Sequence, residues 1–191
     1  DLQECDFIIL PGGFSFGDYL RSGAIAKFSP IMTEIIGFAN AGGYVMGICN
    51  GFQILTESGL LPGALLHNDS HKFICKNTYL KAETRDTLVT NQYTEKAIKI
   101  PIAHGEGKFF ADEKTIESLI LNDQILFRYC DENKNITEKA NPNGSLLNIA
   151  GICNLDRNVF GMMPHPERSA DKELNNQDGL TLFKSILTGI L

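Results

Sequence analysis

The sequence predicts an α/β fold with a mostly parallel sheet, helices on both of its faces, and an antiparallel extension. Three observations lead to this prediction. Short apolar runs bounded by Gly and Pro are typical of buried parallel strands. Amphipathic stretches that suit helices follow several of these runs. In the middle of the chain, two strand-like segments follow each other without a helix between them, as in an antiparallel pair.

The apolar runs give five predicted strands: Phe7–Leu10, Tyr44–Ile48, Ile125–Tyr129, Leu147–Ile152 and Val159–Met163. The predicted antiparallel segments are Phe73–Glu83 and Ala97–Ala103. The Asn- and Lys-rich stretch Asp131–Gly144 is predicted to be a solvated loop.

Three helices are predicted. The first begins at Pro30 with Ser29 as its N-cap, and Gly42-Gly43 ends it. The second follows Cys49 and ends at Gly59, and the third spans Gly179–Ile190. The buried stripe of the first helix is predicted at Ile31, Ile35, Ile36 and Phe38 or Ala39, and that of the third at Leu180, Phe183, Ile186, Leu187 and Ile190.

Length and composition limit the class of protein. The chain has 191 residues, 43% of them hydrophobic and 21% charged, so residues 1–191 are expected to form a single globular domain. Its 17 basic and 23 acidic residues give a net charge of −6 without a basic cluster, which argues against nucleic acid and anionic membranes as partners. No apolar stretch approaches the length of a membrane span.

The cysteines and histidines predict neither disulfides nor a metal site. Five Cys is an odd count and no two have C-x-x-C spacing, so we expect free thiols and a reducing, cytoplasmic location. His67 and His71 are four residues apart, but Pro, Gly, Asn and Asp around them predict a turn rather than a helix.

The segment Gly47-Ile48-Cys49-Asn50-Gly51 links a predicted strand directly to a predicted helix. Gly two positions before and after a central residue is the pattern of a nucleophile elbow, where larger side chains would collide. At a helix N-terminus we expect the Cys49 thiol to have a lowered pKa and the Asn50 N–H to face a developing oxyanion. The alternative is a small buried cysteine packed between strand and helix.

A cysteine nucleophile needs a base, and His165 is the best candidate among the four histidines. It follows a predicted strand, and Pro164 and Pro166 fix the backbone on both sides and disfavour a helix. In an extended chain Glu167 would lie on the same side and could orient the imidazole. The alternative is a surface histidine in a Pro-rich loop.

The turn after the first strand contains Gly12 and Gly13 but has no Walker lysine, so it does not predict a phosphate-binding loop. A backbone N–H at this turn could instead be a second oxyanion donor. An ordinary strand-to-helix turn is the alternative.

These motifs carry a resemblance to a known family. The segment Gly47–Gln53, followed far downstream by His165-Pro166-Glu167, resembles the class I, or triad-type, glutamine amidotransferases, which have a flavodoxin-like fold. Within that family, Pro11–Arg21, Pro101–Gly107 and Met163–Arg168 resemble the glutaminase subunits of phosphoribosylformylglycinamidine synthases.

The resemblance implies roles for individual residues. The nucleophile, general base and orienting carboxylate would be Cys49, His165 and Glu167, and the oxyanion hole would be the N–H groups of Gly13 and Asn50. Substrate contacts would come from Phe14, Gln53, Gly105 and Glu106, the last through its backbone.

The resemblance also implies an activity. The chain would hydrolyse L-glutamine to glutamate and ammonia through a cysteine thioester. The ammonia would pass to a large synthetase subunit that converts formylglycinamide ribonucleotide in purine biosynthesis, with a small bridging subunit in the same complex. ATP and Mg would bind the synthetase, so no cofactor is expected in this chain. Proteins of this family begin with a strand and a helix that this sequence lacks, so we expect these elements to be missing before residue 1.

Three alternatives are kept. One is a related hydrolase of γ-glutamyl peptides, which would be fast without partners. The second is a non-catalytic module that retains the fold, although all three triad residues are present. The third is a phosphate- or nucleotide-binding flavodoxin-like domain, against which the elbow cysteine and the missing Walker lysine count.

Overall fold

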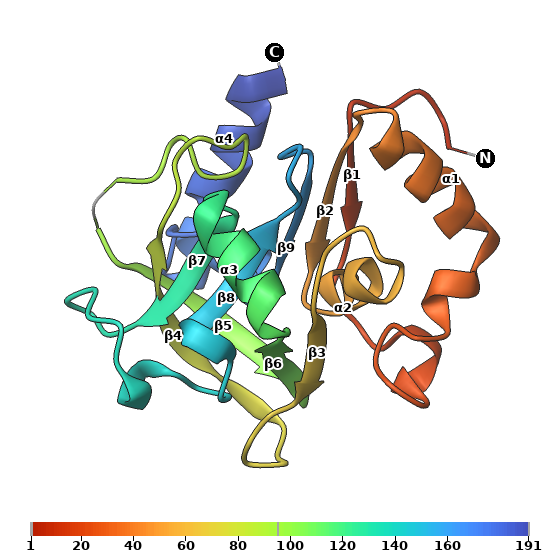
Figure 1. The fold of residues 1–191 in the computed structure, drawn as a ribbon. Helices are drawn as coiled ribbons and strands as arrows, with labels where there is room; N and C mark the ends of the chain where they lie inside the picture. Colours follow the sequence, from red (N-terminus) through yellow and green to blue (C-terminus); the bar gives the residue numbers. More distant parts are fainter. Residues whose placement is uncertain (1, 95, 191) are drawn as a thin grey trace.

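A computed structural model describes residues 2–94 and 96–190 (Figure 1). Its strands are β1 (Phe7–Leu10), β2 (Tyr44–Ile48), β3 (Ala64–His67), β4 (Ile74–Ala82), β5 (Ile98–His104), β6 (Glu106–Phe110), β7 (Ile125–Cys130), β8 (Ile149–Cys153) and β9 (Val159–Met162). Its α-helices are α1 (Pro30–Asn40), α2 (Asn50–Glu57), α3 (Glu113–Leu121) and α4 (Leu180–Ile190).

Seven strands form one sheet in the order β1-β2-β9-β8-β7-β4-β5, and β3 and β6 form a separate antiparallel pair. In Figure 1, α2 and α3 lie in front of the large sheet and α4 lies partly behind it. The α/β class is therefore confirmed, and so is the antiparallel pairing of β4 with β5.

The antiparallel part of the sheet is larger than predicted. Among the strands of the described residues, only the β1–β2 and β2–β9 pairs of this sheet are parallel. Strand β8 pairs antiparallel with both β9 and β7, and β4 pairs antiparallel with both β7 and β5. The turn at residues 154–158 explains the β8–β9 pairing. A connection this short cannot hold the crossover helix that parallel neighbours require. The prediction that most strands of the sheet are parallel was therefore wrong, because it did not consider the length of the connection between each pair of strands.

Glycines on paired strands bring α2 close to the sheet. Gly47 of β2 is paired with Gly161 of β9. A Cβ at Gly47 would lie 2.5 Å from the backbone of Gly51, and one at Gly161 would lie 2.2 Å from the Phe52 ring. The fully buried Phe52 ring fills the space that these glycines leave open.

The helix positions were predicted correctly, but two buried faces were not. In α1 the structure buries Met32 and leaves Ile31 exposed, and in α4 it buries Leu182 and leaves Leu187 exposed. Adjacent positions differ by about 100° around a helix. Both neighbours are apolar in α1, so the sequence does not show which one faces the sheet. Ser29 occupies the N-cap position, but its side chain makes no capping hydrogen bond.

Three elements were not predicted: β3, β6 and α3. The start of α3 has a recognisable signal, because the Asp112 side chain accepts a hydrogen bond from the Thr115 N–H at 2.8 Å. An aspartate at this position is a common N-cap. The strands β3 and β6 are short and pair only with each other. Neither shows the strict apolar alternation that would have marked it.

The loop predicted at Asp131–Gly144 is solvated only in part. Asn143 is buried, and its side-chain amide donates to the Gly107 carbonyl at 2.8 Å. The end of this loop therefore supports the beginning of β6. No helix in the described part of the chain is long and apolar enough to cross a membrane.

The packing of α2 gives a prediction about stability. Gly161→Ala should lower the free energy of unfolding by about 1–3 kcal/mol, because the new methyl group overlaps a buried aromatic ring. Gly37→Ala is the matched control, since it lies in α1 with nothing near the added methyl. It should be neutral or raise the free energy of unfolding by up to about 1 kcal/mol. Urea unfolding measures both, and equal effects would contradict the packing described here.

Candidate active site

Cys49 lies at the junction between β2, which ends at Ile48, and α2, which begins at Asn50. Its backbone has φ 51° and ψ −105°, a strained conformation for a residue with a side chain. A Cβ at Gly51 would lie only 2.0 Å from the Leu10 carbonyl oxygen. The glycines that flank the elbow are therefore required by the backbone of β1 and α2, as the motif predicts.

The thiol itself is buried, with Cys49 only 5% exposed. Burial raises the pKa of the Cys49 thiol from 9.0 to about 12, although the Asn50 N–H and the Arg168 charge lower it. The expected low pKa was therefore wrong, because loss of solvent outweighs the helix N-terminus. The sulfur lies 3.7 Å from the Ala103 carbonyl oxygen, to which the S–H can donate. The resting side chain is a neutral thiol that needs a base.

His165 is held close to a carboxylate. Its backbone N–H donates to the Pro101 carbonyl at 2.8 Å, and the ring is buried. Nδ1 lies 2.6 Å from Oε1 of Glu167. A carboxylate accepts the Nδ1 proton, so Nε2 is left as the basic nitrogen. Nε2 is buried and has no hydrogen-bond partner among residues 2–94 and 96–190.

The predicted contact between His165 and Glu167 exists, but the backbone that makes it is different. Residues Pro166–Ser169 form a 3₁₀ turn, not an extended segment. Pro166 is the first residue of this turn. This position suits proline because the backbone N–H that proline lacks would have no partner there. His165 itself is not helical (φ −103°, ψ 89°), as the flanking prolines predict, but the prediction of an extended backbone as far as Glu167 was wrong.

Gly12 brings the histidine and the cysteine together. A Cβ at Gly12 would lie 2.6 Å from Cε1 of His165 and 3.5 Å from Cβ of Cys49. The imidazole and the cysteine side chain therefore pack against the same glycine. A base, its carboxylate and a buried thiol are thus brought together from two segments far apart in the sequence, with Gly12 of a third segment between them.

A cavity of about 190 Å³ opens beside Cys49. Six of the predicted site residues line it: Gly13, Phe14, Cys49, Gln53, Gly105 and Glu106. The cavity is also lined by residues that were not predicted: Asp18, Ser22, His67, Phe73, Ala103 and His104. Of the remaining predicted residues, Asn50 is buried at the start of α2, and His165 packs behind Gly12 with its Glu167 partner.

Gln53 does more than face the cavity. Its side-chain oxygen accepts from the Asn50 amide at 2.9 Å, and its side-chain nitrogen donates to the Glu106 carbonyl at 2.5 Å. Asn50 in turn accepts from the Ser15 hydroxyl at 2.6 Å. Gln53 and Asn50 therefore connect the loop after β1 with the turn between β5 and β6.

His104 was missed because a histidine at a strand end carries no distinctive signal. It is buried, and burial together with the nearby His165 lowers its pKa to about 4. The Asn68 amide nitrogen donates to the carbonyls of Lys72 and His104, so its oxygen must accept from Nδ1 of His104 at 3.0 Å. His104 is therefore neutral with an unprotonated Nε2, which has no partner in the part of the chain that the structure describes.

The described residues contain no group of three or more His, Cys, Asp or Glu side chains that could hold a metal ion. His67 and His71 are neighbours, with ring centroids 6.2 Å apart. His67 faces Glu106, with its Nε2 3.2 Å from a carboxylate oxygen.

An elbow cysteine beside a histidine–carboxylate pair, at the ends of strands in an α/β sheet, defines a cysteine-dependent amidotransferase or hydrolase. The family model of the CobB/CobQ-like glutamine amidotransferase domain matches residues 1–182. The chain therefore belongs to the CobB/CobQ-like glutamine amidotransferase family.

Individual relatives show which members of this family the chain is similar to. The chain is 58% identical, over 97% of its length and 83% of the relative, to "phosphoribosylformylglycinamidine synthase subunit PurQ" from Synechocystis. It is 54% identical to the subunit of the same name from Koribacter versatilis, over 98% of its length and 81% of the relative. A chain in the structure of PurLQS from Thermotoga maritima superposes with a TM-score of 0.86 at 45% identity, covering all of this chain and 82% of that one.

The buried thiol gives a prediction about reactivity. Without substrate, the rate at which iodoacetamide alkylates Cys49 should rise about tenfold per pH unit between pH 7 and 9.5, because the pKa is raised and the thiolate stays scarce throughout. Cys49→Ser is the control, since the exposed Cys5 and Cys75 also react. A rate that levels off near pH 7 would show a resting thiolate and contradict the prediction.

Proposed function

We propose that the chain is the glutaminase subunit of a phosphoribosylformylglycinamidine synthase, and that it hydrolyses L-glutamine to glutamate and ammonia. One observation carries the proposal: the Cys49 side chain and the His165 ring pack against Gly12 at one end of a cavity, and Glu167 holds the ring. The similarity to the PurQ subunits over nearly the whole chain supports the same activity.

The first half of the reaction uses the neutral thiol. Nε2 of His165 takes the thiol proton as the sulfur attacks the side-chain amide carbon of glutamine. The backbone N–H groups of Gly13 and Asn50 stabilise the oxyanion that forms. The protonated imidazole, whose charge Glu167 stabilises, then gives its proton to the leaving nitrogen. Ammonia departs and a γ-glutamyl thioester remains on Cys49.

The second half restores the enzyme. The imidazole, now neutral again, takes a proton from water as the water oxygen attacks the thioester. The same oxyanion donors act on the second tetrahedral intermediate. Collapse of this intermediate releases glutamate and returns the proton to the sulfur. One glutamine and one water give one glutamate and one ammonia, so no cofactor is needed in this chain.

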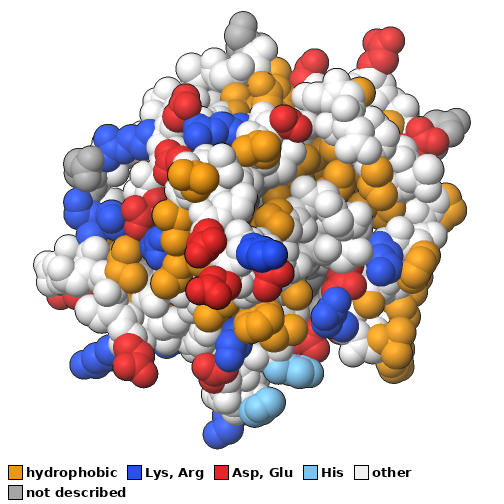
Figure 2. All heavy atoms as spheres, viewed as in Figure 1, with side chains coloured by type: hydrophobic (Ala, Val, Ile, Leu, Met, Phe, Trp, Pro, Cys, Tyr) orange, Lys and Arg blue, Asp and Glu red, His pale blue; other side chains and the backbone are white. Residues whose placement is uncertain are grey.

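Ammonia made here is consumed elsewhere. The chain acts with a large synthetase subunit and a small bridging subunit, and ATP and Mg are bound by the synthetase. The loop between β1 and α1 supports a docking role, because it leaves apolar side chains exposed, namely Phe14, Phe16, Tyr19, Leu20 and Phe28. Of these, Phe14 lines the cavity. Figure 2 shows hydrophobic side chains along the edge of the molecule that this loop forms. We place the complex in the cytoplasm, where free thiols remain reduced.

Replacing Cys49 should abolish glutamine hydrolysis and leave ammonia-dependent synthesis intact. In the assembled complex, Cys49→Ala should lower glutamine-dependent synthesis at least about 1,000-fold, because no thioester can form. Synthesis supplied with ammonium chloride should be unchanged, since the synthetase is intact. Product formation with each nitrogen source measures both. If glutamine-dependent synthesis survives the substitution, Cys49 is not the nucleophile.

Replacing the orienting carboxylate should have a smaller effect. Glu167→Gln should lower kcat/KM for glutamine about 10- to 1,000-fold, less than the ~10,000-fold typical of a buried triad carboxylate. The Glu167 side chain is 43% exposed, so water can replace part of its hydrogen bonding. Glu173→Gln, which removes an exposed carboxylate nearby, is the control and should not change kcat/KM. An unchanged rate for Glu167→Gln would remove Glu167 from the mechanism.

A further inference from the structure

The end of β5 contacts both residues of the proposed nucleophile–base pair. The Pro101 carbonyl accepts from the His165 N–H at 2.8 Å, and the Ala103 carbonyl oxygen lies 3.7 Å from the Cys49 sulfur. From Ala103 to Glu106 the chain lines the cavity beside Cys49. The position of this strand end therefore determines how the wall of the cavity lies relative to the sulfur.

The two sheets do not hold this segment along its whole length. Strand β5 ends at His104 and belongs to the large sheet, whereas β6 begins at Glu106 and pairs with β3. Gly105 is the point where the chain leaves one sheet and enters the other, and neither strand includes it. Backbone groups in this turn therefore need hydrogen-bond partners outside the two sheets.

Asn68, the residue directly after β3, supplies these partners. Its backbone N–H donates to the Gly105 carbonyl at 2.9 Å. Its side-chain oxygen accepts from Nδ1 of His104 at 3.0 Å and from the Gly107 N–H at 3.2 Å. Its side-chain nitrogen donates to the carbonyls of His104 at 2.9 Å and Lys72 at 2.8 Å. Asn68 therefore bonds to three of the four residues in the turn from His104 to Gly107.

The amide of Asn68 is used to its full capacity. An asparagine side chain has two N–H donors and an oxygen that accepts two bonds, and all four bonds are made here. Asn68 is completely buried, so a partner left without its bond would lie away from solvent. Aspartate has no N–H donor and serine has one, so the turn requires the amide itself.

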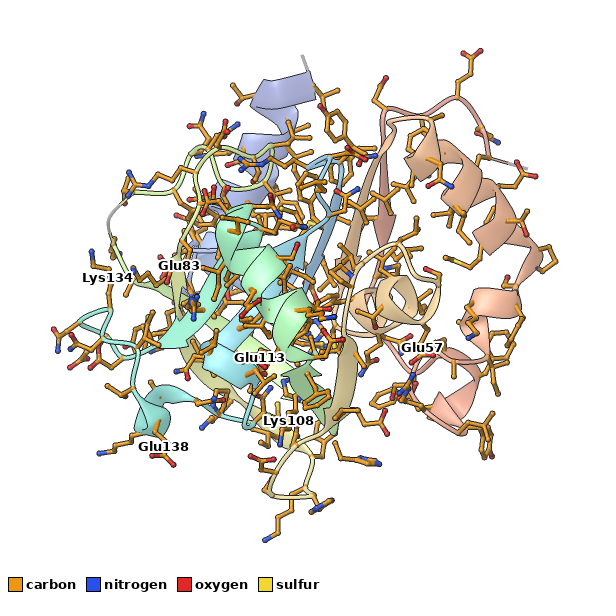
Figure 3. All side chains as sticks on the ribbon, viewed as in Figure 1. Glu57, Glu83, Lys108, Glu113, Lys134 and Glu138 are labelled. Carbon is orange, nitrogen blue, oxygen red and sulfur yellow. The ribbon has the colours of Figure 1, made fainter. Side chains whose placement is uncertain are left out.

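The neighbouring segments hold Asn68 in place. The Asp69 N–H donates to the Asn143 carbonyl at 3.1 Å, and the Asn143 amide donates to the Gly107 carbonyl at 2.8 Å. The Asp69 carboxylate forms an ion pair with Lys108 of β6. Figure 3 shows Lys108 at the end of the molecule where β3 and β6 lie side by side. Asn68 is therefore an ordered contact between the end of β3 and the turn that lines the cavity.

We propose that Asn68 is a positioning residue for glutamine hydrolysis: it holds the turn from His104 to Gly107 so that this wall of the cavity presents the substrate amide to the Cys49 sulfur. This inference rests on the proposed glutaminase function. Asn68 is not among the described residues that line the cavity, so it acts through the wall and does not touch the substrate. Its loss displaces the wall, and attack slows because the sulfur and the amide carbon must lie within about 3.5 Å of each other.

Asn158 provides a matched control. It is also buried, and its side-chain nitrogen also donates to two backbone carbonyls, those of Ala39 at 2.8 Å and Gly43 at 2.9 Å. Asn158 directly precedes β9, and Met162 at the other end of β9 accepts from the Cys49 N–H. Replacing Asn158 therefore removes the same kind of bonds at the end of the strand that lies away from the cysteine.

The test compares Asn68→Ala with Asn158→Ala in the assembled complex. Asn68→Ala should lower kcat/KM for glutamine about 10- to 100-fold, the range for a small displacement of reacting groups. Asn158→Ala should change this value by less than about threefold, although both substitutions should lower the midpoint of urea unfolding. Synthesis from ammonium chloride should equal that of the wild type in both, which shows that the complex folds and assembles.

A second pair of variants covers the case in which Asn68→Ala does not assemble. Asn68→Asp keeps the size of the side chain and its acceptor oxygen, and it removes only the two N–H donors. It should lower kcat/KM for glutamine in the same range. Asn158→Asp removes the same two donors from the control position and should leave kcat/KM within about threefold of the wild type.

A further readout does not depend on turnover. The electrophile 6-diazo-5-oxo-L-norleucine resembles glutamine, so its reaction with Cys49 depends on the wall of the cavity, whereas iodoacetamide is too small to need it. In the Asn68 variants the alkylation rate should fall about 10- to 100-fold for the first reagent and should not fall for the second. Mass spectrometry of the peptide that contains Cys49 separates it from the exposed Cys5 and Cys75.

Outcomes that overturn the inference are distinct from those that overturn the proposed function. Assembled Asn68 variants with kcat/KM within about threefold of the wild type would overturn the inference, and so would an equal loss in the Asn158 variants. An equal fall in both alkylation rates would place the defect at the sulfur and not at the wall, which also overturns it. A wild-type complex that uses ammonia but cannot hydrolyse glutamine would instead overturn the glutaminase function.

Discussion

The structure depends on how closely α2 packs against the ends of β1, β2 and β9. Side chains are absent at Gly12, Gly47, Gly51 and Gly161, and a Cβ at any of these positions would overlap a neighbouring group. Because the helix can approach this closely, the chain turns sharply at Cys49 and adopts a positive φ there. The same close packing holds the imidazole against Gly12. One packing constraint therefore forms the elbow and brings the side chains of Cys49 and His165 to the same glycine.

Close packing also determines the chemistry of the thiol. A sulfur at a helix N-terminus would favour the thiolate if it were solvated. Here the enclosing backbone removes water, and burial raises the pKa of Cys49. We therefore expect Cys49 to react slowly with electrophiles in solution until a base takes its proton. The His165 ring packs beside Cys49 against Gly12, and its Nδ1 is bonded to Glu167. In the proposed mechanism, proton transfer to His165 and attack of the sulfur on the substrate are therefore coupled.

Sequence reasoning succeeded where a function depends on local backbone chemistry. Glycines two positions before and after Cys49 indicate that side chains there would collide with the neighbouring backbone. The elbow could therefore be predicted without a structure. It failed where the answer depends on contacts between distant segments. Asp18 and His104 meet in one cavity only because the loop after β1 and the end of β5 approach α2. The pKa of Cys49 is likewise a property of its enclosure, which no short motif encodes.

Contacts between distant segments also connect the residues of the site in one hydrogen-bond network. Ser15 and Asp18 bond to Asn50, Asn50 bonds to Gln53, and Gln53 bonds to the Glu106 carbonyl. Asn50 is also the residue whose N–H faces the sulfur of the preceding cysteine. The loop after β1 and the turn between β5 and β6 are therefore not independent walls of the cavity. Both are hydrogen-bonded to residues in the first turn of α2. A displacement of either loop therefore changes the hydrogen bonding around Asn50, the residue next to Cys49.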